Sequence, residues 1–266
     1  MRGRNQPAPW LYLFGVIAWT WTFLGIAATT GQGLLEFRTA TLSFLGLLGP
    51  LIVAALLIAA GNWDRNLDCT VLDFFRRSFN LWLLPWRWYL YIVGLIFVLA
   101  IIPVLLDAST LQAQGLIDVG PGLFLFIGFV AGFVEEPGWR GYAQEGLQRR
   151  MPIVLASLVV GVFWAAWHLP LFFIANTYQA GLGVGTPAFW EFNLAIIIGS
   201  PIYGWLYNAT GRVTFAAVFY HGFGNVMFEI VPDATIIAEL GVEAMLALLL
   251  TLLARRWMFR PRLLER

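Results

Sequence analysis

Long apolar runs, separated by short polar segments, repeat along the entire chain. A run of roughly 18 or more apolar residues can cross the ~30 Å hydrocarbon core of a bilayer as a helix. The pattern therefore predicts an all-α, polytopic membrane protein, a bundle of about eight transmembrane helices. The predicted spans cover roughly residues 9–29, 41–60, 88–106, 121–142, 152–174, 189–207, 213–230 and 236–256.

The basic residues are all arginines, and nearly all of those between the predicted spans fall on one side of the predicted bundle. Because basic residues near helix ends favour the cytoplasmic side, their distribution predicts that both termini are cytoplasmic, N-in and C-in, with Arg38 alone outside. The segment FFRRSFNLWLLPWRW (74–88) between the second and third spans predicts an amphipathic helix in the cytoplasmic interface. The predicted cytoplasmic arginines are Arg2, Arg4, Arg65, Arg76, Arg77, Arg87, Arg149, Arg150, Arg212, Arg255, Arg256, Arg260, Arg262 and Arg266.

Composition supports one transmembrane domain over residues 1–266, because 60% of the residues are hydrophobic and only 12% are charged. A soluble domain carries about a quarter charged residues. The apolar run at 9–29 exceeds the roughly 7–15 residues of a cleaved signal, so we expect a retained span. The net charge of +1 gives no information about partners, we expect no nucleic-acid partner, and the single Cys69 excludes an internal disulfide. The absence of lysine and the compact loops suit a prokaryotic cytoplasmic membrane.

A few polar side chains fall inside the predicted spans, where an ionised group costs at least ~2.5 kcal/mol. His168 and His221 are the only histidines, and they accompany Glu135, Glu136 and Asn225. Counted from the turns between spans at ~1.5 Å per residue, Glu135, His168 and His221 lie at similar depths, with Asn225 one turn beyond His221. The simpler interpretation is that each of these residues only hydrogen-bonds to a neighbouring helix.

Glu135 and Glu136 are adjacent, but the spacing to Arg140 predicts different environments for them. Arg140 follows Glu136 by four residues, the favourable order for an ion pair on a helix, whereas Glu135 is rotated by ~100°. Pro137 removes a backbone donor, so we expect the helix to bend at this position. The alternative is that both glutamates serve only as structural partners of Arg140. That alternative leaves the two histidines at the same depth unexplained.

Three motifs on separate spans resemble those of one family. EEPGWRGYAQEGLQRR (135–150) resembles the Glu-Glu-x-x-x-Arg motif, with its Gly-Tyr continuation, of the intramembrane glutamic proteases. This CPBP or Abi family includes CAAX prenyl endopeptidases and bacteriocin-processing or immunity proteins. WAAWH (164–168) is similar to its Phe-x-x-x-His motif, with Trp164 at the aromatic position, and HGFGN (221–225) to its His-x-x-x-Asn motif. The resemblance covers about residues 120–230.

The resemblance implies the roles of the polar residues. Glu135 would be the general base that takes a proton from water, and His168 would orient the same water. His221 and Asn225 would donate hydrogen bonds to the oxyanion of the tetrahedral intermediate. The expected activity is an endopeptidase without a cofactor, acting near the cytoplasmic side on a membrane-associated peptide or protein, prenylated in the CAAX members.

Glu136, Arg140 and Trp164 would surround these catalytic groups and hold the site. Two other functions stay open at this point. One is a zinc metalloprotease that uses two imidazoles and a carboxylate, although no His-Glu-x-x-His helix is present. The other is a non-enzymatic immunity or regulatory protein in the membrane. The sequence leaves the substrate, the oligomeric state and the role of Glu243 undetermined.

Overall fold

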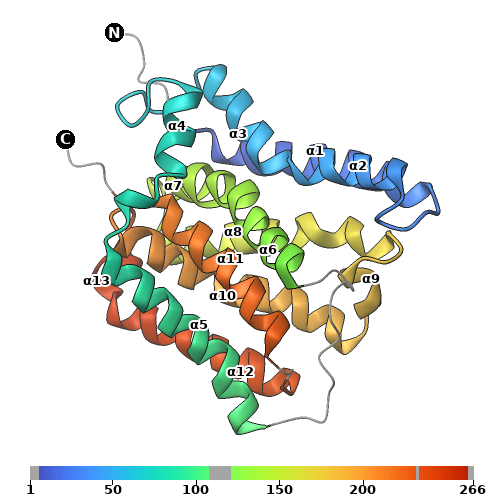
Figure 1. Ribbon diagram of the computed structural model, residues 1–266. Helices are drawn as coiled ribbons and strands as arrows, with labels where there is room; N and C mark the ends of the chain where they lie inside the picture. The colour runs from blue at the N-terminus through green and yellow to red at the C-terminus, as the bar shows by residue number, and fades with distance from the viewer. Residues whose placement is uncertain (1–5, 108–120, 232–233, 263–266) are drawn as a thin grey trace.

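The chain folds into helices that pack in layers (Figure 1). The computed structural model describes residues 6–107, 121–231 and 234–262, and no strand occurs among them. The all-α, polytopic membrane architecture expected from hydropathy is confirmed. The described segments are α1 (Pro9–Thr29), α2 (Phe37–Leu47), α3 (Gly49–Ala59), α4 (Val71–Ser78), η1 (Leu81–Leu83), α5 (Trp86–Leu106), α6 (Pro121–Glu136), η2 (Pro137–Gln144), α7 (Glu145–Gln148), α8 (Ile153–His168), η3 (Leu169–Phe173), α9 (Tyr178–Leu182), α10 (Pro187–Ala209), α11 (Thr214–Ile230), α12 (Ile236–Leu253) and α13 (Arg255–Met258).

Helices α6, α8, α10 and α11 form the middle of the molecule (Figure 1). There α6 packs against α11, and α8 packs against α10. Helices α1, α2 and α3 lie on one side of this group, whereas α5 and α12 lie on the other, against α11 and α10. The central helices are thus flanked by other helices on both sides, an arrangement that allows polar groups to be buried within a membrane protein.

The predicted span 41–60 differs from expectation, because the structure forms two helices there, α2 and α3, bent by 45°. Pro50 has no backbone N–H and its ring crowds the carbonyl of Gly46, so a continuous helix cannot form at this position. The freed carbonyl finds another donor: the Thr20 hydroxyl on α1 donates to Gly46 O at 2.8 Å. A side chain of the neighbouring helix thus satisfies the broken backbone ladder, as burial in lipid requires.

Within the described residues, four helical stretches are long and apolar enough to cross a membrane: Pro9–Thr29, Trp86–Leu106, Ile153–Phe173 and Ile236–Leu253. The bent pair of α2 and α3 makes a fifth if it is taken as one span. The remaining predicted spans also contain helices, namely α6 with η2, α10 and α11, but these fall short in length or apolarity. Among them, α6, η2 and α11 carry Glu135, Glu136, Arg140 and His221. The total of eight spans therefore stays a prediction.

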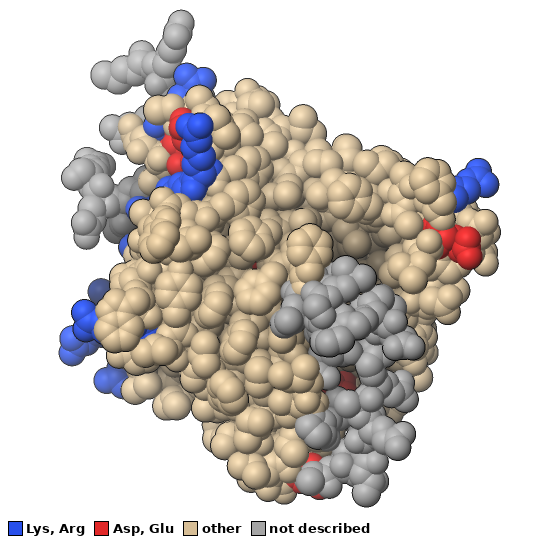
Figure 2. All heavy atoms as spheres, viewed as in Figure 1, with Lys and Arg blue, Asp and Glu red and all other residues tan. Residues whose placement is uncertain are grey.

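The loops that carry the predicted cytoplasmic arginines meet at one end of the bundle. Arg149 pairs with both Glu145, at 3.0 Å, and Asp64, at 3.1 Å, and Arg212 pairs with Glu145 at 3.0 Å. Figure 2 shows basic side chains gathered at this end and a smaller charged patch at the opposite end. Arg38 begins the helix that follows the α1–α2 loop, far from the arginine-rich end in Figure 1. Arg2, Arg4 and Arg266 lie outside the described residues.

The segment 74–88, predicted as one amphipathic helix, is helical only in part: α4 ends at Ser78, the short helix η1 follows, and α5 begins at Trp86. The N-terminus of α4 carries a capping box, in which the side chains of Thr70 and Asp73 each accept the other's backbone N–H. Phe74 is fully buried against the bundle, whereas Leu72 and Arg76 are exposed. A helix with one inward apolar face and one outward face of mixed character suits a position at the membrane surface.

Candidate active site

The residues singled out by the sequence come from separate helices that the fold brings together. Helix α6 packs against α11, and η2 contacts α8 as well as α11. These contacts place the three sequence motifs around one point in the middle of the bundle. We refer to the following residues as the candidate cluster: Glu135, Glu136, Arg140, Trp164, His168, His221 and Asn225.

The two glutamates end α6, and the chain then changes its helical form. Glu135 is 7% exposed and Glu136 is fully buried. From Pro137 to Gln144 the chain forms a π-helix, η2. Proline cannot donate to the i−4 carbonyl, which favours a local departure from the α-helix, and π-helical turns occur frequently at functional sites. The predicted change of the helix at Pro137 is therefore present.

Glu136 is held from two sides. Arg140 Nη1 donates to both of its carboxylate oxygens, at 3.1 and 3.0 Å, which confirms the ion pair predicted from the spacing. On the other side, Nδ1 of His221 lies 2.8 Å from Glu136 Oε1. This second partner is 85 positions away along the chain, so spacing within one helix gave no sign of it. The carboxylate thus joins α6, η2 and α11.

The guanidinium of Arg140 is enclosed by groups from α8 and α10. Its Cζ lies 3.9 Å from the centre of the Tyr203 ring and 4.5 Å from the Trp164 ring. Its Nη2 also donates to Ser200 Oγ at 3.4 Å, and the residue is only 1% exposed. A buried ion pair is stable only when its remaining hydrogens and charge find partners. The contacts of Tyr203 and Ser200 with Arg140 were not predicted, because nothing in the sequence of α10 marks these residues as its neighbours.

Glu135 has a different partner from Glu136. Nε1 of Trp164 donates to Glu135 Oε2 at 2.7 Å. Among the described residues this is the side-chain hydrogen bond that Glu135 forms, and its carboxylate makes no ion pair with Arg140 there. The alternative that both glutamates hold Arg140 is therefore wrong. Trp164 was expected to act only as a packing neighbour, so its donor role is new.

His168 lies at the end of α8 in an aromatic surround. Its Nδ1 is 2.8 Å from the carbonyl oxygen of Trp164, and a carbonyl can only accept, so Nδ1 carries the hydrogen. The ring meets the edges of Trp167 and Phe192, with centroids at 4.7 and 5.2 Å. In the neutral tautomer set by this contact, Nε2 is an acceptor, and it has no hydrogen-bond partner in the described part of the chain.

Asn225 lies one turn beyond His221 on α11, as the sequence indicates. Its Nδ2 donates to Gly128 O on α6 at 3.4 Å, which leaves the second hydrogen of the amide for another acceptor. The two helices approach closely here, because a Cβ on Gly132 would lie 2.6 Å from Val218 O. No direct contact of Asn225 with Glu135 or His168 is present among the described residues. One hydrogen of the Asn225 amide is thus turned toward α6 and away from the other residues of the candidate cluster.

Comparison with known proteins identifies the family. A family model described as type II CAAX prenyl endopeptidase Rce1-like matches residues 116–227, which contain the whole candidate cluster. A CAAX prenyl protease 2 from Methanococcus maripaludis is 30% identical over 229 residues, which cover 80% of this chain and 82% of the relative. The chain belongs to this CAAX prenyl protease family.

Membership confirms the resemblance that the three motifs carry. The chain is a member of a membrane protease family, consistent with its apolar helices, and proteins of this family act on membrane-associated protein substrates. The relative from Methanococcus maripaludis is archaeal, which agrees with the expected prokaryotic setting.

The zinc alternative finds little support in the donor geometry. In the described residues, no group of three His, Cys, Asp or Glu side chains is arranged so that it could hold a metal ion.

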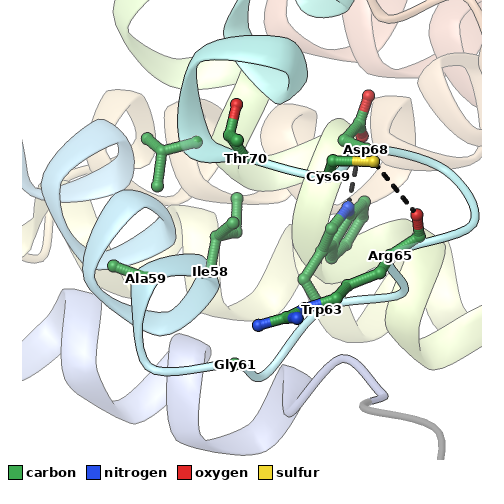
Figure 3. A pocket seen from close by; sticks show the side chains of 9 residues that line it. Ile58, Ala59, Gly61, Trp63, Arg65, Asp68, Cys69 and Thr70 are labelled. Atoms are coloured by element: carbon green, nitrogen blue, oxygen red, sulfur yellow. Dashed lines mark hydrogen bonds between the residues drawn. The ribbon is translucent and has the colours of Figure 1, made fainter.

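A cavity of about 240 Å³ lies away from the candidate cluster, at the arginine-rich end (Figure 3). It opens between the end of α3 and the start of α4. Asp68 borders it, accepting from Trp63 Nε1 at 3.2 Å, and Cys69 Sγ faces Arg65 O at 3.8 Å. Cys69 is thus remote from the candidate cluster, as its position in the sequence suggests. The cavity shares no residue with the candidate cluster.

Proposed function

We propose that this chain is an intramembrane, glutamate-dependent endopeptidase that hydrolyses a peptide bond of a membrane-associated, CAAX-type prenylated substrate. The observation that carries the proposal is the environment of Glu135. Its carboxylate is buried, accepts a hydrogen bond from Trp164 at one oxygen and forms no ion pair with any of the described residues, while the carbonyl oxygen of the same Trp164 accepts from His168. A buried carboxylate without a structural counterion is a costly arrangement that indicates function.

The proposed reaction begins with a water between Glu135 and Nε2 of His168. Glu135 takes one proton of the water, and Nε2 of His168 accepts a hydrogen bond from the other. The water oxygen then bonds to the carbonyl carbon of the substrate, whose π electrons move onto the carbonyl oxygen. When the tetrahedral intermediate collapses, the C–N bond breaks and the proton on Glu135 passes to the leaving amine.

The developing oxyanion needs hydrogen-bond donors, and α11 offers two. His221 turns Nδ1 toward Glu136, so Nε2 is the atom left to face a substrate, and it donates when the imidazole is protonated. Asn225, one turn farther along, has a second amide hydrogen beyond the one given to Gly128. Donors held rigidly before the reaction stabilise the transition state without reorganisation. The Glu136 contact provides that rigidity for His221.

The ion-pair network at the arginine-rich end supports a site on the cytoplasmic side of the membrane. Glu145, which belongs to that network, follows Glu135 by ten residues of helix, or roughly 15 Å. If the arginine-rich end is cytoplasmic, as the distribution of arginines predicts, Glu135 lies within the cytoplasmic half of the bilayer. A lipid-modified C-terminal segment could reach that depth, which supports the substrate class that the name of the archaeal relative suggests.

The test measures cleavage of a farnesylated CAAX peptide by purified protein in proteoliposomes, with the products identified by mass spectrometry. Glu135→Gln keeps the size of the side chain and the hydrogen bond from Trp164 but removes the base. We expect the variant to lose at least about 100-fold in kcat, the usual worth of a general base. Glu36→Gln, at an exposed glutamate before α2, is the matched control and should cleave as the wild type does.

Each outcome has a defined meaning. Cleavage by Glu135→Gln at the wild-type rate would show that the proposed mechanism is wrong. Absence of cleavage by the wild-type protein, together with an unchanged set of protein termini in membranes of cells that express it, would favour the non-enzymatic immunity or regulatory role. The same peptide without the prenyl group tests whether the lipid is required for recognition.

A further inference from the structure

Trp164 contacts several residues of the candidate cluster, through its indole N–H, its backbone carbonyl and its ring. Its Nε1 donates to Glu135, and its carbonyl oxygen accepts from Nδ1 of His168. Its ring lies 4.5 Å from the Arg140 Cζ and 5.3 Å from the centre of the His221 ring. One residue of α8 thus contacts the proposed base, the proposed water-orienting group and the ion pair behind them.

We propose that Trp164 is a positioning residue for Glu135: its indole N–H fixes one carboxylate oxygen, so that the other oxygen is presented to the attacking water. The proposal rests on the proposed function, because it gives Glu135 the role of base. A hydrogen bond to a charged group is short and strong. The 2.7 Å distance from Nε1 to Oε2 fits that class.

The ring of Trp164 is held so that the donor cannot turn away. The residue is 5% exposed, and the edge of Tyr203 meets its ring with centroids at 5.3 Å and planes at 85°. Arg140 lies over the same ring and is itself fixed by Glu136. A donor whose orientation is fixed by packing loses little entropy when it binds the carboxylate. The indole therefore supplies a preorganised contact to Glu135.

The contact depends on the presence of a tryptophan at position 164. The family motif that residues 164–168 resemble has phenylalanine at the first position, and phenylalanine fills similar space but has no hydrogen to donate. In the described part of this chain no other side chain donates to Glu135. Trp164→Phe is therefore expected to fold, since the ring and its backbone carbonyl are retained, while the donor is lost.

The first experiment separates the donor from the ring. Trp164 is changed to phenylalanine and, by suppression of a stop codon, to benzothienylalanine, in which sulfur replaces the indole N–H at nearly the same shape. Cleavage of the farnesylated CAAX peptide in proteoliposomes then gives kcat and KM. We expect both replacements to lower kcat about tenfold or more, the effect of losing a hydrogen bond to a charged group, with KM changed by less than about twofold.

Trp19→Phe is the matched control. Its Nε1 donates to Leu45 O at 2.8 Å, between α1 and α2 and away from the candidate cluster. The variant loses a hydrogen bond of similar length and should retain the wild-type kcat. An unchanged kcat in the benzothienylalanine protein would overturn the proposal. A fall in stability without a fall in kcat would assign Trp164 a structural role only, which also contradicts it.

A second experiment tests the contact without any substrate. Protein labelled with ¹⁵N at tryptophan in detergent micelles gives indole N–H signals, and the signal of Trp164 is the one lost in Trp164→Phe. We expect Glu135→Gln to move this signal, because an amide oxygen is a weaker acceptor than a carboxylate. An unmoved signal would overturn the proposal. A moved signal in a protein that cleaves no peptide would instead refute the proposed function, with the contact intact.

Discussion

Glu136 and His221 are joined by a hydrogen bond of 2.8 Å between Oε1 and Nδ1, although they are 85 positions apart in the sequence. Their side chains are 0% and 8% exposed, so the contact lies inside the bundle. It determines which nitrogen of the imidazole faces Glu136 and which faces the other way. The same carboxylate also binds Arg140, so the second glutamate of the pair organises the candidate cluster rather than only bending a helix.

Glu136→Gln should damage both stability and activity. The amide retains an acceptor for His221 but leaves Arg140 buried without its counterion, and removing one partner of a buried pair costs about 3–5 kcal/mol. We expect a clearly lower thermal unfolding midpoint in detergent. We also expect kcat to fall about 100-fold, because a displaced imidazole no longer meets the substrate correctly. Wild-type behaviour in both measurements would show that the Glu136 contacts are dispensable.

Arg140→Lys should fail to replace arginine. The Arg140 Cζ lies close to the ring centres of Tyr203 and Trp164 while Nη1 binds both oxygens of Glu136, and an ammonium group cannot do both. Loss of the desolvated cation–π contacts should cost about 2 kcal/mol, measured by thermal or denaturant unfolding in micelles. Arg150→Lys, at an exposed position just after α7, is the control and should be neutral. Equal stability of the two variants would contradict the expectation.

Gly132→Ala should separate α6 from α11. Its new Cβ would lie 2.6 Å from a backbone oxygen, Val218 O, so the helices must move apart. Overpacking of this kind costs about 1–3 kcal/mol, and the shift should also reduce peptide cleavage because Glu135 and His221 lie on the two helices. Gly94→Ala on α5 meets nothing within 4 Å and should be neutral or stabilising by up to about 1 kcal/mol. A neutral Gly132→Ala would contradict the close approach.

Peptide cleavage should survive removal of metal ions. Treatment with a strong chelator, followed by elemental analysis, should leave kcat/KM within about twofold and no stoichiometric zinc in the purified protein. The prediction rests on the arrangement of the described side chains, in which no group of three His, Cys, Asp or Glu residues could hold a metal ion. Loss of activity that zinc restores would revive the metalloprotease alternative.

Several features could be predicted from the sequence because they depend on the spacing of nearby residues or on the lipid environment. Apolar runs must form helices in lipid, where every backbone polar group needs an internal partner, so the helix positions were predictable. The pairing of Glu136 with Arg140 follows from one turn of helix. The bend within 41–60 was not predicted, although Pro50 lies at it. The carbonyl of Gly46 that the proline frees is satisfied by the Thr20 hydroxyl on another helix, and only the tertiary structure shows that contact.

The sequence by itself determined the class of protein, the motifs and the distinction between the two glutamates, since these depend on hydropathy and on neighbours within a few residues. Only the tertiary structure decided which groups from different helices meet: Glu136 with His221, and Glu135 with Trp164. The reason is physical. Packing of α6 against α11 and of η2 against α8 selects one pairing among many that the sequence permits, and small residues such as Gly132 set how closely those helices approach.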